Sequence, residues 1–254
     1  MRQKLLAFLA AFALVFTGAA TAELGAAEAS FAAGEYQAAL AEASDTTDPD
    51  ELAFSARALL AEAMSGPSDP PEALLHAALD KADAALAIDP KHVEGRLQRA
   101  IALSLILRPM STRAARKTGW GEEARDLARS VLEDDPGNVY AHGFLSVWNV
   151  EVVRRGGRIG AMIMGASVKD GRAHYEAAIA TDPEDAALHW QWARALAALN
   201  CRKYHDEIAA ALEAALTVPT HSVLQEVMQA RAATLKAELQ RGNAEAEALA
   251  ARML

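Results

Sequence analysis

Apolar residues recur at intervals of three and four positions along most of this chain after residue 22. That spacing places them on one face of an α-helix, and no stretch shows the alternation of β-branched and polar residues that a half-buried strand has. The pattern therefore predicts an all-α protein. Helices are expected over residues 23–33, 35–44, 48–64, 71–88, 92–107, 120–134, 138–154, 168–181, 185–199, 203–217, 221–240 and 243–253.

A proline ends the apolar stripe at four places in the chain. The segments are AALAIDP (84–90), SVLEDDP (130–136), AAIATDP (177–183) and EAALTVP (213–219). Proline cannot continue a helix, and the aspartate before three of them (Asp89, Asp135 and Asp182) is expected to cap the helix that follows. A unit that recurs in this way is an internal repeat, which predicts a helical solenoid.

Small side chains occupy equivalent positions in successive units. Ala100, Ser146 and Ala193 each follow a closing proline by ten residues. Small residues let two helices approach closely, because little volume stands between the two backbones. We therefore expect these three positions to lie where paired helices touch.

The segment Gly34–Leu40 reads GEYQAAL, with the pattern of a turn that leads into a second helix. Together with the closing prolines it resembles the tetratricopeptide repeat (TPR). The resemblance implies paired antiparallel helices in a right-handed α-solenoid of four to five pairs over residues 23–242. A C-terminal capping helix or tail is expected over 243–254.

The units are longer than the roughly 34 residues of an ordinary TPR. The extra residues fall in Gly66–Pro71, Pro109–Gly121 and Arg155–Lys169. Each insertion lies between the first and second helix of a pair. Solenoid geometry places such turns along one edge, so we expect the insertions to form a rim.

A more specific resemblance rests on the segment HGFLSVW (142–148), followed by Gly157, a long insertion and HYEAA (174–178). These residues are similar to the TPR-like regulator of microtubule dynamics family and its exported bacterial relatives. A looser similarity is to the periplasmic TPR subunit of tripartite ATP-independent (TRAP) transporters. The resemblance implies a binding role but not microtubule binding, because the chain begins with an export signal.

That signal occupies residues 1–22. Arg2 and Lys4 precede the apolar run Leu5–Phe16, and the Ala20–Ala22 segment (ATA) provides a small-x-small cleavage site. These features predict a cleaved signal peptide and a periplasmic protein, with an uncleaved N-terminal anchor as the alternative. The net charge of −9 argues against nucleic acid as a partner. Cys201 is the only cysteine, so no intramolecular disulfide forms.

A search for catalytic chemistry finds no constellation of acid, base and nucleophile. The seven histidines form no zinc-binding motif, and we expect His142, His174 and His189 to pack near the core with one ring nitrogen bonded to a backbone carbonyl. The glycines after position 156 follow a helix and not a strand, so they do not form a phosphate-binding loop. The sequence therefore predicts no enzyme, no metal site and no cofactor.

Three surfaces are candidates for binding. The concave face is expected to present Leu97, Ile101, Tyr140, Val147, Glu151, Trp190 and Arg194, with Trp192 in the core. The rim gathers the cations Arg108, Arg113, Arg116, Lys117, Arg154, Arg155 and Arg158 into one positive patch. They either hold an anion or pair with acidic residues, and Arg108, Arg154 and Arg155 alternatively compensate the charge at helix C-termini. The insertion also carries an uncharged run, 159–168, with Ile159, Met162, Ile163 and Met164, which either folds back over the groove or contacts a partner or bilayer.

Taken together, these patterns predict a non-catalytic periplasmic binding or scaffold protein that holds a peptide or protein partner on its concave face. One alternative is an accessory subunit of solute or envelope transport that binds a small ligand. The other is a protein that docks on anionic lipid through its basic rim.

Overall fold

The computed structural model describes residues 22–66 and 69–253, and the predicted signal peptide lies outside these ranges apart from Ala22. Its helices are α1 (Ala22–Ala32), α2 (Tyr36–Glu42), α3 (Pro49–Ser65), α4 (Glu72–Ile88), α5 (Val93–Leu107), α6 (Thr112–Thr118), α7 (Trp120–Asp134), α8 (Val139–Met164), α9 (Val168–Thr181), α10 (Ala186–Asn200), α11 (His205–Thr217), α12 (Val223–Arg241) and α13 (Asn243–Ala250). The described part contains no strand. None of its helices is both long and apolar enough to cross a bilayer.

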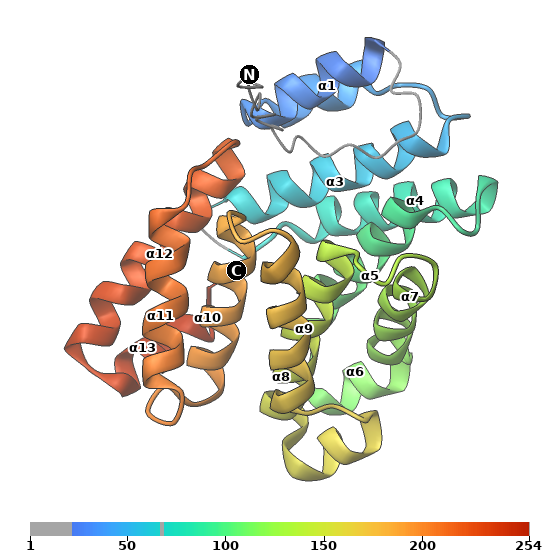
Figure 1. Cartoon of the computed structure of the whole chain (residues 1–254). Coiled ribbons are helices and arrows are strands. Elements are labelled where there is room, and N and C mark those ends of the chain that lie inside the picture. The colour runs from blue at the N-terminus through green and yellow to red at the C-terminus, as the bar shows by residue number, and fades with distance from the viewer. Residues whose placement is uncertain (1–21, 67–68, 254) are drawn as a thin grey trace, which may run out of the picture.

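The helices pack as consecutive pairs, which makes the fold an α-solenoid (Figure 1). The pairs are α1–α2, α3–α4, α5–α7, α8–α9 and α10–α11. First helices of neighbouring pairs also touch, as α3 touches α5 and α8 touches α10. Helix α12 packs on α10 and α11, and α13 folds back onto α10 and α12, so these two helices cover the C-terminal end of the stack.

The aspartates before the closing prolines act differently from our expectation. Asp89, Asp135 and Asp182 each accept a bond from the backbone N–H two residues later, inside the turn itself. The helices that follow are capped by other residues, namely His92, Asn138 and Asp185. The prediction of helix capping was wrong because two further residues separate each Asp-Pro from its next helix, and an aspartate side chain reaches only about two residues on.

The three small residues of the repeat lie where helices touch. Ala100 and Ala193 are fully buried, and Ser146 is 2% exposed with its hydroxyl bonded to the carbonyl of Gly143. Gly171 on α9 marks the same closeness, since a Cβ there would lie 2.8 Å from the carbonyl oxygen of Ser146. The α8–α9 pair is thus in backbone contact at this point.

We expect Ala193→Leu to destabilise the protein by about 1–3 kcal/mol, because added methylenes in a filled core force neighbours apart. The corresponding loss in melting temperature is about 2–4 °C for each kcal/mol in a domain of this size. Ala210→Leu on α11 is the matched control, since Ala210 is exposed. Equal melting temperatures for the two variants would contradict the register of the repeat.

The insertions contain more helix than the sequence indicated. Pro109–Gly121 holds the short helix α6, and α8 continues through the third insertion to Met164. Gly157 interrupts α8 with a φ of 58° and a ψ of −164°, so its last two turns take a new direction. Only glycine adopts this conformation readily, and a side chain there would strain the backbone.

The solenoid curls until its last long helix meets its first pairs. Arg231 of α12 donates to the carbonyls of Met64 and Gly66 at the end of α3, at 2.7 and 2.9 Å. The turn between α1 and α2 touches the start of α12, where a Cβ on Gly34 would lie 3.0 Å from Val223. The two ends of the stack are therefore joined across the concave face.

Two histidines share a hydrogen bond between α8 and α9. Nδ1 of His142 lies 2.8 Å from Nδ1 of His174, and Nε2 of His142 bonds the carbonyl of Pro136 at 3.0 Å. His189 likewise bonds the carbonyl of Pro183. The expected carbonyl contact is thus confirmed for His142 and His189, whereas His174 bonds the ring of His142.

This pair should make stability depend on pH. Burial, then the neighbouring His142 and Arg129, lower the pKa of His174 although Asp170 opposes them. The unfolded chain therefore binds more protons than the folded one, and stability should fall as the pH drops below about 6.5, by up to 1.4 kcal/mol per pH unit. Melting curves between pH 7.5 and 5.5 test this.

The His174→Gln variant, which keeps a donor for His142, should flatten the pH dependence. His205→Gln is the control, because His205 is exposed and should leave the curve unchanged. An identical slope in wild type and His174→Gln would contradict the role of the pair.

Candidate ligand-binding chamber

The concave face forms a partly open chamber with a volume of about 530 Å³. Its walls come mainly from α1, α3, α5, α8, α10 and α12, with contributions from α6 and the start of α7. The second helices α4, α9 and α11 contribute no lining residue. This division follows from the pairing, since the second helix of each pair lies on the outer surface of the curl.

The middle of the chamber is apolar. Side chains that line it are Leu60, Met64, Leu97, Ile101, Leu105, Phe144, Val147, Leu224 and Met228. Such a surface favours the apolar part of a ligand, because its burial removes apolar area from water on both sides. The volume lies within the roughly 300–1,000 Å³ typical of ligand sites.

One end of the chamber carries a mostly buried ion pair. Nε of Arg57 lies 2.9 Å from Oε1 of Glu94, and each side chain is 14% exposed. Arg57 also contacts Glu28 and lies 5.0 and 4.8 Å from the ring centroids of Phe31 and Phe54. Burial raises the pKa of Glu94, and Arg57 opposes this shift. The Arg57 cation is thus held by both charge and aromatic faces.

A second charged cluster lies on the α8 and α10 walls. Glu151 accepts from Arg154 at 2.7 Å and from Arg194 at 3.1 Å. Burial works against the charge of Glu151, but Arg194 and Arg154 outweigh it and lower its pKa. A single carboxylate therefore pairs with two cations at the chamber wall.

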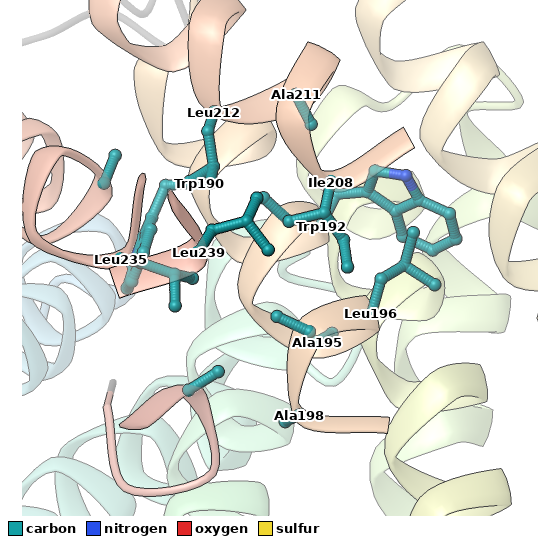
Figure 2. Packing of buried hydrophobic residues seen from close by; sticks show 14 of the residues in the cluster. Trp190, Trp192, Ala195, Leu196, Ala198, Ile208, Ala211, Leu212, Leu235 and Leu239 are labelled. Carbon is teal, nitrogen blue, oxygen red and sulfur yellow. The ribbon is translucent and has the colours of Figure 1, made fainter. Parts of the chain in front are cut away.

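Six of the seven residues predicted for the concave face line the chamber, namely Leu97, Ile101, Tyr140, Val147, Glu151 and Arg194. Trp190 is the exception. It is fully buried and packs with Leu212, Leu235 and Leu239, away from the chamber (Figure 2). Trp192 lies in the core as expected.

The wrong assignment of Trp190 has a physical reason. Helix α10 is enclosed by α8, α11, α12 and α13, so almost all of its positions are buried. When apolar residues surround a helix, their pattern does not indicate which face of the helix points into the chamber. The inward positions are Leu188 and Gln191, next to Arg194.

The basic rim contains fewer available cations than the seven predicted. Arg155 donates to the carbonyls of Leu107 and Met110 at 3.2 and 2.5 Å, and Arg154 is paired with Glu151. Arg108 donates to the carbonyls of Ala251 and Met253 in the C-terminal tail. The expectation of one seven-cation patch was therefore wrong, since three of the arginines hold the structure together.

Among the rim cations, Arg108 has the pKa that departs most from its ordinary value. Burial, with the neighbouring Arg194 and Arg154, lowers its pKa to about 10, although Glu151 opposes the shift. Its bonds to tail carbonyls fasten the end of the chain to the end of α5. The remaining cations of the rim, Arg113, Arg116, Lys117 and Arg158, are exposed and make no ion pair within the described ranges.

Some apolar side chains of the insertion line the chamber, and others are exposed to solvent. Ile163 and Met164 line the chamber, and the carbonyl of Met164 accepts from Arg125 at 3.0 Å. Ile159 and Met162 are 71% and 76% exposed. The insertion therefore covers one edge of the groove while its outer face stays open.

Sequence reasoning missed the buried pair Arg57–Glu94 and the closing residue Arg231. A charged residue inside the apolar run LAFSARALL (52–60) was the signal for Arg57. No signal identified Arg231, because its partners are backbone carbonyls of residues 64 and 66, far away in the chain. Within the part of the chain that the structure describes, no group of three His, Cys, Asp or Glu residues could hold a metal ion.

Comparison with known proteins supports the fold alone. No family model and no curated protein matches this chain. The structure is similar to TTC0263, a thermophilic TPR protein of Thermus thermophilus, with a TM-score of 0.58 and 20% identity over 84% of this chain and 98% of that one. It also matches a monomeric mutant of IFIT1 with Gppp-AAAA, with a TM-score of 0.47 and 16% identity over 85% of this chain and 54% of that one.

The helix pairs and the similarity to TTC0263 define the class of protein. The chain is an all-α, TPR-like solenoid, a fold that commonly mediates protein–protein interaction.

Proposed function

We propose that this protein is a non-catalytic, exported binding protein that holds the apolar side chains of a peptide or protein partner in its chamber. The observation that carries this proposal is the partly open apolar chamber on the first helices of the pairs. A preformed cavity lowers the entropic cost of binding, because few protein groups have to be ordered when the ligand enters. The resemblance to exported TPR-like proteins agrees with a binding role.

A small apolar ligand is the second candidate, and the contact between the two ends of the solenoid favours it. Hydrogen bonds from Arg231 join α12 to the end of α3, so the concave face does not continue as a long open groove past these ends. A volume of about 530 Å³ suits a single compact ligand. In that case the protein is an accessory subunit of solute or envelope transport, as the similarity to the TRAP-associated subunit implies.

A variant whose chamber is filled by a bulky side chain tests whether the chamber binds a ligand or has a purely structural role. Ser104 lines the chamber on α5 and is partly exposed, so Ser104→Trp introduces bulk there with little loss of core packing. Ala87→Trp is the control, because Ala87 is exposed on α4 and α4 does not line the chamber. Both variants should keep the helical circular dichroism spectrum and the melting temperature of the wild type.

The probes are a panel of synthetic peptides with clustered apolar side chains and a series of alkyl compounds, measured by displacement of N-phenylnaphthylamine. Peptide binding that Ser104→Trp weakens at least tenfold supports the peptide partner. Binding of the alkyl series alone supports the small ligand. If neither class displaces the dye, or if both variants bind like the wild type, the chamber is not a ligand site.

Export is tested separately. The mature protein should begin at Glu23 when the full chain is produced in a bacterial host and isolated from its periplasm, because cleavage is expected after Ala22. N-terminal sequencing decides this. A mature chain that retains Leu5–Phe16 would instead indicate an N-terminal membrane anchor.

A further inference from the structure

Two surface segments combine unpaired cations with exposed apolar side chains. One is the helix α6, and the other is the end of α8 beyond the glycine at position 157. We call their exposed residues the docking tip. Its members are Arg113, Arg116, Lys117, Arg158, Ile159, Met162 and Ile163.

The apolar side chains of the docking tip share one face of a helix. Ile159, Met162 and Ile163 are 71%, 76% and 57% exposed and follow an i, i+3, i+4 spacing. Within the described part, only Ile88 and Tyr140 are other large exposed hydrophobic residues, and they lie elsewhere in the chain. Single exposed apolar residues are normal, whereas three on one helical turn mark an interaction surface.

The cations of α6 repeat the same spacing. Arg113, Arg116 and Lys117 lie at i, i+3 and i+4, so they project from one face of the helix. They are exposed and have no acidic partner in the described ranges, although the chain carries a net charge of −9. Other arginines of this chain, such as Arg57 and Arg99, are paired with carboxylates. Three cations on one face of a single helix therefore form a local positive patch on a chain whose net charge is negative.

The two segments are fastened to each other. The hydroxyl of Thr112, at the start of α6, donates to the carbonyl of Arg155 at 3.3 Å. The guanidinium of Arg155 binds the carbonyls of Leu107 and Met110, which flank the turn into α6. Figure 1 shows α6 and the yellow end of α8 on the same side of the molecule. The docking tip is thus a fixed surface that combines both chemistries.

We propose that the docking tip binds an anionic phospholipid bilayer at its interface. A bilayer surface offers negative headgroups above an apolar layer, which complements cations beside protruding apolar side chains. Ile159 and Met162 are each more than two-thirds exposed, so they project outward and insert into a soft layer more readily than into a rigid protein face. Arg116 and Ile163 also line the chamber, so docking brings the edge of the chamber close to the lipid.

The test is co-sedimentation of the full mature protein with vesicles. One set contains phosphatidylcholine alone, and the other contains phosphatidylcholine with phosphatidylglycerol. The α6 variant carries Arg113→Glu, Arg116→Glu and Lys117→Glu. The control carries Lys91→Glu, Arg129→Glu and Arg202→Glu, which change the net charge equally at exposed positions on other helices and turns.

Wild type and the control should sediment with the phosphatidylglycerol vesicles and not with phosphatidylcholine alone. The α6 variant should lose at least tenfold in vesicle affinity. Binding should also weaken steeply as salt rises, because exposed charges are screened over about 8 Å at physiological ionic strength. The proposal fails if wild type does not bind the anionic vesicles, or if the control loses as much affinity as the α6 variant.

The apolar contribution is tested with Ile159→Ser/Met162→Ser, against Ile88→Ser as a control on α4. The double variant should bind anionic vesicles at least fivefold more weakly, and Ile88→Ser should bind like wild type. Unchanged binding of the double variant would overturn insertion into the bilayer. A concentration-dependent dimer in analytical ultracentrifugation that the double variant abolishes would overturn the proposal as well and reassign the docking tip to a second copy of this chain.

Discussion

Replacement of Glu151 by Gln should destabilise the protein by about 3 kcal/mol or more, because it leaves Arg154 and Arg194 without the carboxylate that they share. Arg194 is 6% exposed in its side chain and Arg154 is 26% exposed, so water compensates little of the loss at Arg194. Arg108 lies close enough for its pKa to be lowered by both of these arginines. The melting temperature should fall by roughly 6–12 °C.

Glu238→Gln is the matched control for this variant. Glu238 also pairs with an arginine three residues away, but that partner, Arg241, is 74% exposed. Exposed pairs contribute about 0–1 kcal/mol, so the control should melt close to wild type. Addition of Arg194→Met to Glu151→Gln should restore part of the lost stability. A Glu151→Gln variant as stable as wild type would show that the cluster is solvated and energetically neutral.

The pH dependence of Glu151 follows from the direction of its pKa shift. Its pKa is lower in the folded state than in the unfolded chain, so its contribution is present above the ordinary glutamate pKa and is lost as the pH falls through the folded value. Wild type should therefore lose stability in acid below about pH 4.5. Glu151→Gln should lack this part of the acid transition.

Replacement of Arg57 by Met should destabilise the protein by about 3–5 kcal/mol, because Glu94 then remains mostly buried without its cation. The aromatic rings of Phe31 and Phe54 lose their contact with the guanidinium at the same time. Chemical denaturation in urea, compared with wild type, measures the loss.

The double variant Arg57→Met/Glu94→Gln separates charge from packing. If the uncompensated carboxylate causes the loss, this variant should be more stable than Arg57→Met alone. Arg57→Met alone should also gain stability on mild acidification, because a folded pKa above the unfolded one favours the folded state as Glu94 takes up a proton. No difference between the single and double variants would assign the loss to packing against the two phenylalanines.

Helices α7 and α9 were predicted from the sequence at the bounds that the structure has, 120–134 and 168–181. Both carry clear signals, namely a periodic apolar stripe inside the segment and a proline two residues after its end. Helix α6 was missed because its seven residues, TRAARKT, bury no side chain and so carry no apolar stripe. The extension of α8 was missed because glycines within it, including Gly157, normally end a helix.

In the candidate site too, residues whose placement depends on nearby sequence were predicted correctly, whereas contacts with distant parts of the chain were not. Leu97, Ile101 and Val147 were placed on the concave face from helical phase and the resemblance to the TPR, and they line the chamber. Trp190 could not be placed in this way, because α10 is buried on nearly all sides. Arg108 and Arg155 were expected to hold an anion, to pair with acidic residues or to compensate the charge at a helix C-terminus. Their partners are backbone carbonyls, which every residue offers and no sequence pattern marks.

The sequence by itself determined the all-α class, the repeat of paired helices and the positions where those helices touch. These properties depend on residues within a few turns of each other, and helical periodicity and proline record them directly. Only the tertiary structure decided that the two ends of the solenoid meet, through hydrogen bonds from Arg231 of α12 to the end of α3. It also decided that Arg108 binds carbonyls of the C-terminal tail. Closure depends on the small rotation between successive pairs, which adds up over the whole stack and is set by packing at every contact.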